Sequence, residues 1–228
     1  MKTSILILFS FLFSSIASAQ SKEKSYNNLD LSFNFSDLAL VPAISYQRYF
    51  LLGEKRKFGV GPGLRLYGIS SGSDWRFAET NAPEDNFNDG DPNVNAFIAD
   101  QTRVASLNLG IYFNYRFSDK FEIGLNTDLI GLSFGGSSDG IFTVAETGEV
   151  FPVSNIEAES FVLFPVHGSY ATEMIWFGYH VGNDFIIRLG FIFADFKYKI
   201  EDGIVPGVKE NAYERIFNLA SLGLSYRF

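Results

Sequence analysis

The chain has 228 residues and no cysteine, and it carries 18 basic against 26 acidic residues. The missing thiols exclude disulfides, a thiolate metal site and lipid attachment to a cysteine. The acidic balance argues against nucleic acid as a partner, because phosphates demand a basic face. After residue 20, no stretch approaches the roughly 18 consecutive apolar residues that a transmembrane helix requires.

The N-terminus has the three parts of a secretory signal. Lys2 supplies the positive charge, residues 5–13 are apolar, and residues 17–19 (Ala-Ser-Ala) match the small-residue cleavage pattern. We therefore expect a cleaved signal peptide over residues 1–19 and a single domain over residues 20–228. Removing Lys2 leaves 17 basic against 26 acidic residues, a net charge of 17 − 26 = −9.

Beyond the signal peptide, apolar and polar residues alternate with a period of two, which is typical of strands with two different faces. Residues 107–117 show the pattern, and it restarts at residue 121, which predicts a hairpin with a very short turn. In chain order, the predicted strands cover residues 28–36, 41–50, 58–69, 104–117, 121–134, 161–181, 185–199 and 213–228.

Eight strands are favoured, but ten remain an alternative. The segment 161–181 is longer than the roughly 9–11 residues that one spanning strand needs. Residues 141–144 and 150–153 also resemble a hairpin standing on an external loop.

The connections between the predicted strands differ in length at the two ends. Short links (residues 51–57, 118–120 and 181–184) alternate with long ones (70–102, 135–159 and 201–212), and only 37–40 is a short link on the long side. Aromatic residues gather beside the short links, as in the girdles of membrane barrels. A soluble sandwich would have no reason to gather its rings at one end, so a barrel is favoured.

The last seven residues, Leu222-Gly223-Leu224-Ser225-Tyr226-Arg227-Phe228, resemble the assembly signal of outer-membrane barrels, with Leu222, Leu224, Tyr226 and Phe228 at every second position. With the signal peptide, this ending makes the chain similar to the small outer-membrane β-barrel family, of the outer-membrane protein A barrel type. The Phe- and Asn-rich composition is similar to that of members from Bacteroidota.

The resemblance implies an all-β fold, a transmembrane antiparallel up-and-down β-barrel integral to the cell outer membrane of a Gram-negative bacterium. It also implies contact with outer-membrane lipid and lipopolysaccharide, and with the barrel-assembly machinery during biogenesis. An envelope protein of unknown identity is a further candidate partner.

Six charged residues fall on the face that we expect to line the lumen. They are Arg65, Arg116, Glu122, Asp128, Arg188 and Arg227. Charges at membrane depth must face water or a partner, and the interior of an eight-stranded barrel is just filled by side chains. We therefore expect a packed polar network, to which His180 also belongs. The alternative is a path for ions or small solutes, suggested by the glycine-lined strand over residues 58–66.

A weaker pattern points to an enzyme. His167 and Ser169 have the spacing found in barrel enzymes of the lipid A deacylase family, and Glu173 is the nearest carboxylate that could complete a triad. However, no Asn follows Ser169, and Glu173 lies four residues further on, about 13 Å along an extended strand. Catalysis is therefore a minor alternative.

The long link 70–102 holds seven acidic residues. Its segment 85–90 resembles a calcium loop, but Phe87 occupies a ligand position and Ala96 stands where the bidentate Glu belongs. We expect a solvated external loop and neither a metal nor a cofactor. The main functional hypothesis is a non-enzymatic barrel with a structural, adaptor or surface-interaction role. A narrow channel or transporter is the first alternative, and a lipid A-modifying enzyme is the second.

Overall fold

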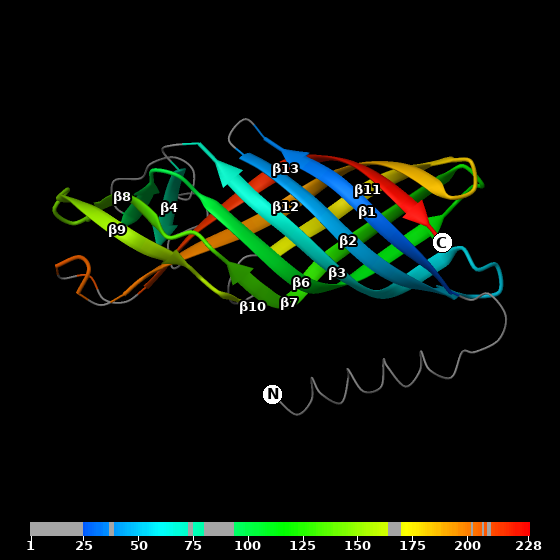
Figure 1. Ribbon diagram of the computed structural model, residues 1–228, viewed down its shortest axis with the longest axis horizontal. Helices are drawn as coiled ribbons and strands as arrows, with labels where there is room; N and C mark the ends of the chain where they lie inside the picture. The colour runs from blue at the N-terminus through cyan, green and yellow to red at the C-terminus, as the bar shows by residue number, and fades with distance from the viewer. Residues whose placement is uncertain are drawn as a thin grey trace, which may run out of the picture.

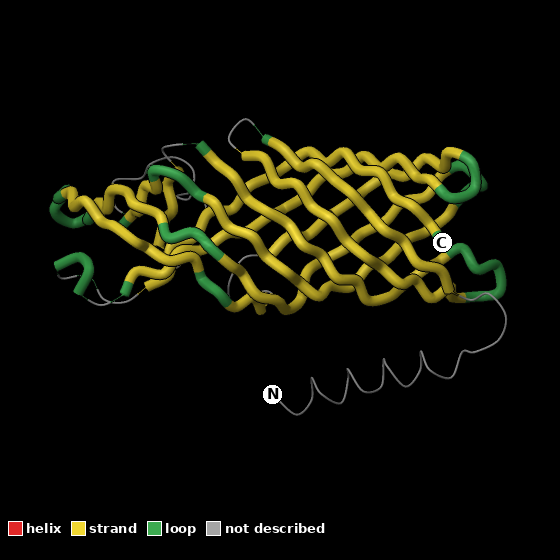
Figure 2. The backbone as a smooth tube through the Cα atoms, in the orientation of Figure 1, coloured by secondary structure: helices red, strands yellow, loops and turns green. Residues whose placement is uncertain are grey.

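The computed structural model describes residues 25–36, 39–72, 75–79, 94–163, 170–201, 203–206, 208 and 211–228. Over these residues the chain is all β, and its strands belong to one antiparallel sheet of thirteen strands (Figure 2). Within this described part, no helix has the length and apolar character needed to cross a membrane.

Eight of the strands pair in a closed order and form the barrel wall. They are β1 (Ser25–Phe35), β2 (Ala39–Leu52), β3 (Phe58–Ser71), β6 (Arg103–Arg116), β7 (Phe121–Phe134), β11 (Tyr170–Val181), β12 (Phe185–Ile200) and β13 (Asn211–Arg227). Each is antiparallel to the next, and β13 pairs with β1 to close the ring. The predicted all-β, antiparallel up-and-down barrel is confirmed.

Five shorter strands complete the sheet. They are β4 (Trp75–Glu79), β5 (Ala96–Ala99), β8 (Ser138–Thr143), β9 (Val150–Ala158) and β10 (Phe161–Leu163). The long predicted strand 161–181 therefore contains two separate strands, β10 and β11, which both pair with β7. Strands β8 and β9 form the hairpin predicted around residues 141–153.

The connections from β3 to β6, from β7 to β11 and from β12 to β13 lie at one end of the barrel, which we call the long-loop end. The turns from β2 to β3, from β6 to β7 and from β11 to β12 lie at the other, the short-turn end. Four of the short strands build a second ring at the long-loop end. Strands β4, β5, β8 and β9 pair in that order; β4 then pairs with β13 through Tyr213 and Glu79, and β9 with β12 through Tyr198 and Ala158. Because β12 and β13 also pair with each other, this ring of six strands is closed. We call it the cap. It lies at the end of the barrel opposite to the C-terminus (Figure 1).

The barrel wall is inside out relative to a soluble protein. On β1, Leu29, Leu31 and Phe33 are 43–49% exposed on the outer face, whereas Asp30 and Asn34 on the inner face are 4% and 1% exposed. The same alternation follows the other wall strands, on whose outer face large apolar side chains are exposed. The outer wall is therefore mainly apolar, and the buried polar side chains of these strands face the lumen.

A β-bulge in β7 shifts the expected alternation. Leu109 pairs with Ile130 and Gly110 with Asp128, so Leu129 is the extra residue. Beyond the bulge, the side chains that face outward are those of Ile130, Leu132 and Phe134, at even positions. Before it, the outward side chains stand at odd positions, as Leu129 does. Bulges insert one residue in this way and change which side chains face outward.

The lumen has two halves of different character. At the short-turn end it is polar. Towards the long loops it is apolar and continues into the core of the cap, where Phe77 lies 4.9 Å from the ring centroid of Tyr198 and 6.1 Å from that of Phe97. We call this continuous region the apolar core. Its buried residues include Val41, Ile69, Val104, Ile192, Leu219, Trp75, Phe142, Phe196 and Tyr213.

We expect Phe77→Ala to destabilise the cap selectively, by roughly 3–5 kcal/mol, because it removes a fully buried ring and leaves a cavity. Trp75 and Trp176 are the only tryptophans, so fluorescence in a Trp176→Phe background reports unfolding of the cap. The midpoint in denaturant should fall for Phe77→Ala and stay unchanged for Ile141→Ala, whose side chain is 43% exposed on the cap. Equal midpoints for the two variants would contradict the role of Phe77.

Candidate functional site

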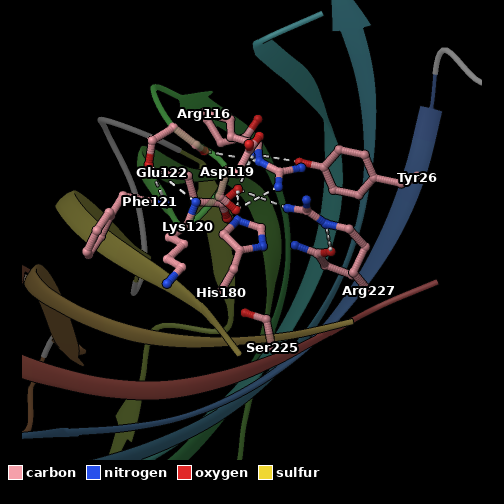
Figure 3. A network of polar contacts seen from close by, with 12 residues as sticks. Tyr26, Arg116, Asp119, Lys120, Phe121, Glu122, His180, Ser225 and Arg227 are labelled. Carbon is pink, nitrogen blue, oxygen red and sulfur yellow. Dashed lines mark hydrogen bonds and ion pairs between the residues drawn. The ribbon is translucent and has the colours of Figure 1, made fainter. Parts of the chain in front are cut away.

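A buried carboxylate organises the lumen at the short-turn end. Glu122, on β7, is 1% exposed and lies 2.9 Å from Arg227 Nη2 on β13. His180 Nε2 of β11 lies 3.2 Å from the same carboxylate oxygen, and Asn114 Nδ2 of β6 donates to it at 3.3 Å. In Figure 3 the side chains of Glu122, His180 and Arg227 lie toward one another in the lumen, and Tyr26 of β1 lies beside Arg227. Asn114 also donates to the Tyr26 hydroxyl at 2.5 Å, and the Arg227 guanidinium lies 4.0 Å from the Tyr26 ring centroid.

Two further carboxylates bind arginines deeper in the barrel. Asp30 accepts hydrogen bonds from Arg188 and Ser225, and from Gln47 Nε2 at 2.9 Å. Asp128 accepts from Asn108 Nδ2 at 2.9 Å and lies 3.8 Å from Arg65 Nη1. Each buried arginine thus has a carboxylate partner, which is the condition for keeping charges away from water.

Glycines make room for the rings that fill the remaining space. A Cβ on Gly63 would overlap the ring of Tyr112, and one on Gly124 would overlap the ring of Trp176. Both rings are buried, and Trp176 lies against Arg188, 3.9 Å from guanidinium carbon to ring centroid. In the strand whose glycines suggested a solute path, Gly63 therefore accommodates an aromatic side chain. Sequence reasoning left out Tyr112 and Trp176, although their inward parity was readable.

Five of the six charged residues expected in the lumen lie in this network, and Arg116 does not. Arg116 stands at the last position of β6 and donates to the backbone carbonyls of Ser118 and Asp119 in the following turn. Alternation gives the face of a strand but not the depth along it, so a residue at a strand end can have the inward parity and still lie at the rim. His180 lies in the network, as expected.

The four residues of the expected assembly signal all face outward. Leu222, Leu224, Tyr226 and Phe228 are 42–57% exposed on β13 and at the C-terminal residue that follows it. The rings of Phe185 and Tyr226 lie 5.3 Å apart, and those of Tyr226 and Phe228 lie 5.7 Å apart. Together they belong to an aromatic girdle at the short-turn end. Binding of these residues by assembly machinery stays a prediction.

The lumen leaves little free space. Where the polar and apolar halves meet, a cavity of about 20 Å³ is lined by Asp30, Asn34, Arg65 and Arg188 among others. This volume suffices for about one water molecule. A more open groove of about 330 Å³ lies outside, between the cap and the barrel mouth, and its polar lining includes Asp100, Arg103, Asp139 and Asn155.

A second ion cluster, which sequence reasoning missed, lies where the cap joins the barrel. Lys197 Nζ of β12 is 2.7 Å from Glu214 Oε2 of β13 and 3.3 Å from Asp195 Oδ2. All three side chains are buried. Asp195 lies beyond Phe193, the last apolar residue of the outer face of β12, and hence above the apolar wall. Burial raises the pKa of Asp195 to about 7, against the attraction of Lys197.

The enzyme hypothesis falls largely on residues outside the described part of the chain. His167 and Ser169 lie there, and of Glu173 only the backbone position in β11 is described. The acidic segment 85–90 lies outside it as well. Among the described residues, no group of three or more potential His, Cys, Asp or Glu ligands could hold a metal ion. Catalysis therefore stays a prediction, which mass spectrometry of lipid A with and without the gene would test.

Comparison with known proteins adds information on the fold alone. No family model matches the sequence, and neither does any curated protein. Among solved structures, the chain is similar to Neisserial surface protein A (NspA; 11% identity, TM-score 0.42, covering 92% of this chain and 100% of that one). It is also similar to Ail, the attachment invasion locus protein of Yersinia pestis, in complex with the heparin analogue sucrose octasulfate (8% identity, TM-score 0.36, covering 90% of this chain and 97% of that one). A third similar structure is the COG4313 outer membrane channel from Pseudomonas putida F1 (9% identity, TM-score 0.26, covering 92% of this chain and 97% of that one). All three identities are 11% or lower and all three TM-scores are below 0.5, so these likenesses carry no argument about the role of the chain.

We expect Glu122→Gln to destabilise the barrel by about 3–5 kcal/mol, because it leaves Arg227 in the lumen without its carboxylate. Denaturant unfolding from detergent micelles measures the change. Asp119→Asn, in the exposed turn three residues earlier, is the matched control and should unfold like the parent chain. A Glu122→Gln midpoint equal to that of the control would show that the network adds nothing to stability.

The raised pKa of Asp195 predicts that the cap loses stability as pH rises. The folded state holds the proton up to about pH 7, whereas the unfolded chain releases it near pH 4. The contribution of this group is therefore fully present below about pH 4, declines between pH 4 and 7, and is lost above pH 7. The denaturation midpoint reported by Trp75 fluorescence should be higher at pH 5 than at pH 8, and Asp195→Asn should reduce the difference. An unchanged pH dependence in that variant would refute the assignment.

Proposed function

We propose that this chain is an integral outer-membrane barrel that does not conduct solutes and that presents a rigid acidic cap at the cell surface, in a structural, adaptor or surface-interaction role. The observation that carries the proposal is the lumen, which is filled along its length by two different kinds of packing. A polar network fills it at the short-turn end, and the apolar core fills it towards the cap.

The membrane location is supported by the inversion of the barrel faces. Large apolar side chains on the outer wall are exposed, while aspartate, asparagine and arginine between them are buried. Contact of this apolar surface with water would be unfavourable, whereas the hydrocarbon chains of lipids would solvate it. Three short turns lie at one end of the barrel, and three long connections and one short one, between β1 and β2, lie at the other. Outer-membrane barrels likewise have short turns at one end and longer loops, outside the cell, at the other.

The absence of conduction is supported by two barriers in series. An ion entering from the short-turn end would have to displace Glu122, Arg227 and their partners, which bind one another. It would then meet the apolar core, in which buried aromatic rings lie in contact. A dry apolar region cannot replace the hydration shell of an ion, so the second barrier holds even if the first rearranges.

A surface role is supported by the charge of the cap end. Among the residues that the structure describes there, the exposed acidic ones are Asp100, Asp139, Glu146, Glu149, Glu157 and Glu201, and the exposed basic ones are Arg103 and Lys199. Such a surface attracts basic partners or divalent cations, and it repels polyanions. The cap is held by paired strands, so these charges have fixed positions relative to the barrel.

Planar-bilayer recording of the purified chain tests the proposal. We expect no conductance steps above leak, because both barriers stay closed, while an open porin added under the same conditions gives steps. Heat-modifiable migration on a gel confirms that the recorded protein is folded. Stable open-channel steps from the folded chain would refute the filled lumen and favour the channel alternative.

A further inference from the structure

An arginine faces outward from the barrel wall near the short-turn end. Arg48 of β2 is exposed on the same face as Ile44 and Tyr46, which are 45% and 44% exposed. Its guanidinium lies 5.5 Å from the ring centroid of Phe50, and no ion pair joins it to a carboxylate of the described chain. A charge on a lipid-facing wall must reach a polar group, because hydrocarbon does not solvate it.

The neighbours of Arg48 place it at the level of lipid headgroups. Asn27 of β1 stands opposite Arg48, and Asn27 Oδ1 accepts a hydrogen bond from the Tyr46 hydroxyl at 2.9 Å. The Tyr46 ring lies 6.4 Å from that of Phe228, which belongs to the aromatic girdle. Aromatic girdles mark the boundary between hydrocarbon and headgroups. A guanidinium, a hydroxyl and an amide therefore share one patch of the outer wall at this boundary.

The adjoining turns add more positive charge. The basic rim comprises Arg48, Lys55, Arg56, Lys57, Arg116 and Lys120, against the acidic side chains of Glu54, Asp119 and Asp184. Lys57 Nζ donates to the carbonyl of Phe117 at 3.4 Å, which holds this ammonium group beside the exposed rings of Phe117 and Phe121. The whole chain has a net charge of −8, so a basic excess at one end reflects local placement rather than overall composition.

We infer that the basic rim binds the headgroups of anionic phospholipids in the periplasmic leaflet, with Arg48 contacting the lipid phosphate from the barrel wall. A guanidinium matches phosphate oxygens with two parallel hydrogen bonds, and the lysines of the turns add attraction to an anionic surface. The Tyr46 hydroxyl and the Asn27 amide supply further hydrogen-bonding groups beside the phosphate. The inference rests on the proposed membrane location and names a lipid class for one end of the barrel.

Native mass spectrometry of the full chain, folded in a zwitterionic detergent, tests this inference. Phosphatidylglycerol and phosphatidylcholine with identical acyl chains are titrated in parallel, and the bound lipids are counted. The parent chain should retain phosphatidylglycerol at least about fivefold better, and Arg48→Gln or Lys57→Gln should each lower its retention by about fivefold, the effect of one basic residue at a membrane surface. Arg103→Gln, an exposed arginine at the opposite end of the barrel, should leave retention unchanged.

Heat-modifiable migration and reconstitution into bilayers accompany each variant. A folded, inserted parent chain that binds both lipids equally would overturn the inference and leave the proposed membrane role intact. The inference would be overturned in the same way if Arg48→Gln and Lys57→Gln retained as much phosphatidylglycerol as Arg103→Gln. A parent chain that folds but does not insert into bilayers would overturn the membrane role and the inference together.

Discussion

Closure of the backbone hydrogen bonds is the constraint on which the other features of this barrel depend. In hydrocarbon, every N–H and C=O of a spanning strand needs a partner within the protein. The pairing of β1 with β13, from Asn28 with Arg227 to Phe35 with Ala220, joins the first strand to the last and leaves no edge in the wall. Because the outer face is apolar, the polar side chains must turn inward, where Asp30, Asp128 and Glu122 balance the arginines.

The wall could be predicted from the sequence because its signal is local. Alternation with a period of two runs through most of the wall, and it places Arg65, Glu122, Asp128 and Arg188 on the inner face. The partners of these residues could not be predicted. Arg188 and Asp30 are 158 positions apart, and their contact depends on the stagger between strands that meet only when the barrel closes. A bulge such as that at Leu129 adds an offset that alternation does not reveal.

The cap escaped sequence reasoning because its strands lack two different faces. In β4, Trp75, Phe77 and Ala78 are all buried, and in β5 three of the four residues are buried. A short strand covered on both sides shows no period of two, and both strands lie in the long acidic link, whose composition is typical of a solvated loop. Only the hairpin of β8 and β9, which keeps some alternation, could be anticipated.

Strands β12 and β13 run from the barrel into the cap without interruption. Their pairing extends from Phe185 with Tyr226 to Ile200 with Asn211, so both rings share one continuous pair of strands. A force that pulls on the cap would act along these two strands, so many inter-strand hydrogen bonds would have to break together. The pairing of β12 with β13 has no interruption at which the cap could tilt. A molecule bound to the cap would thus be held at a fixed height and orientation relative to the barrel wall.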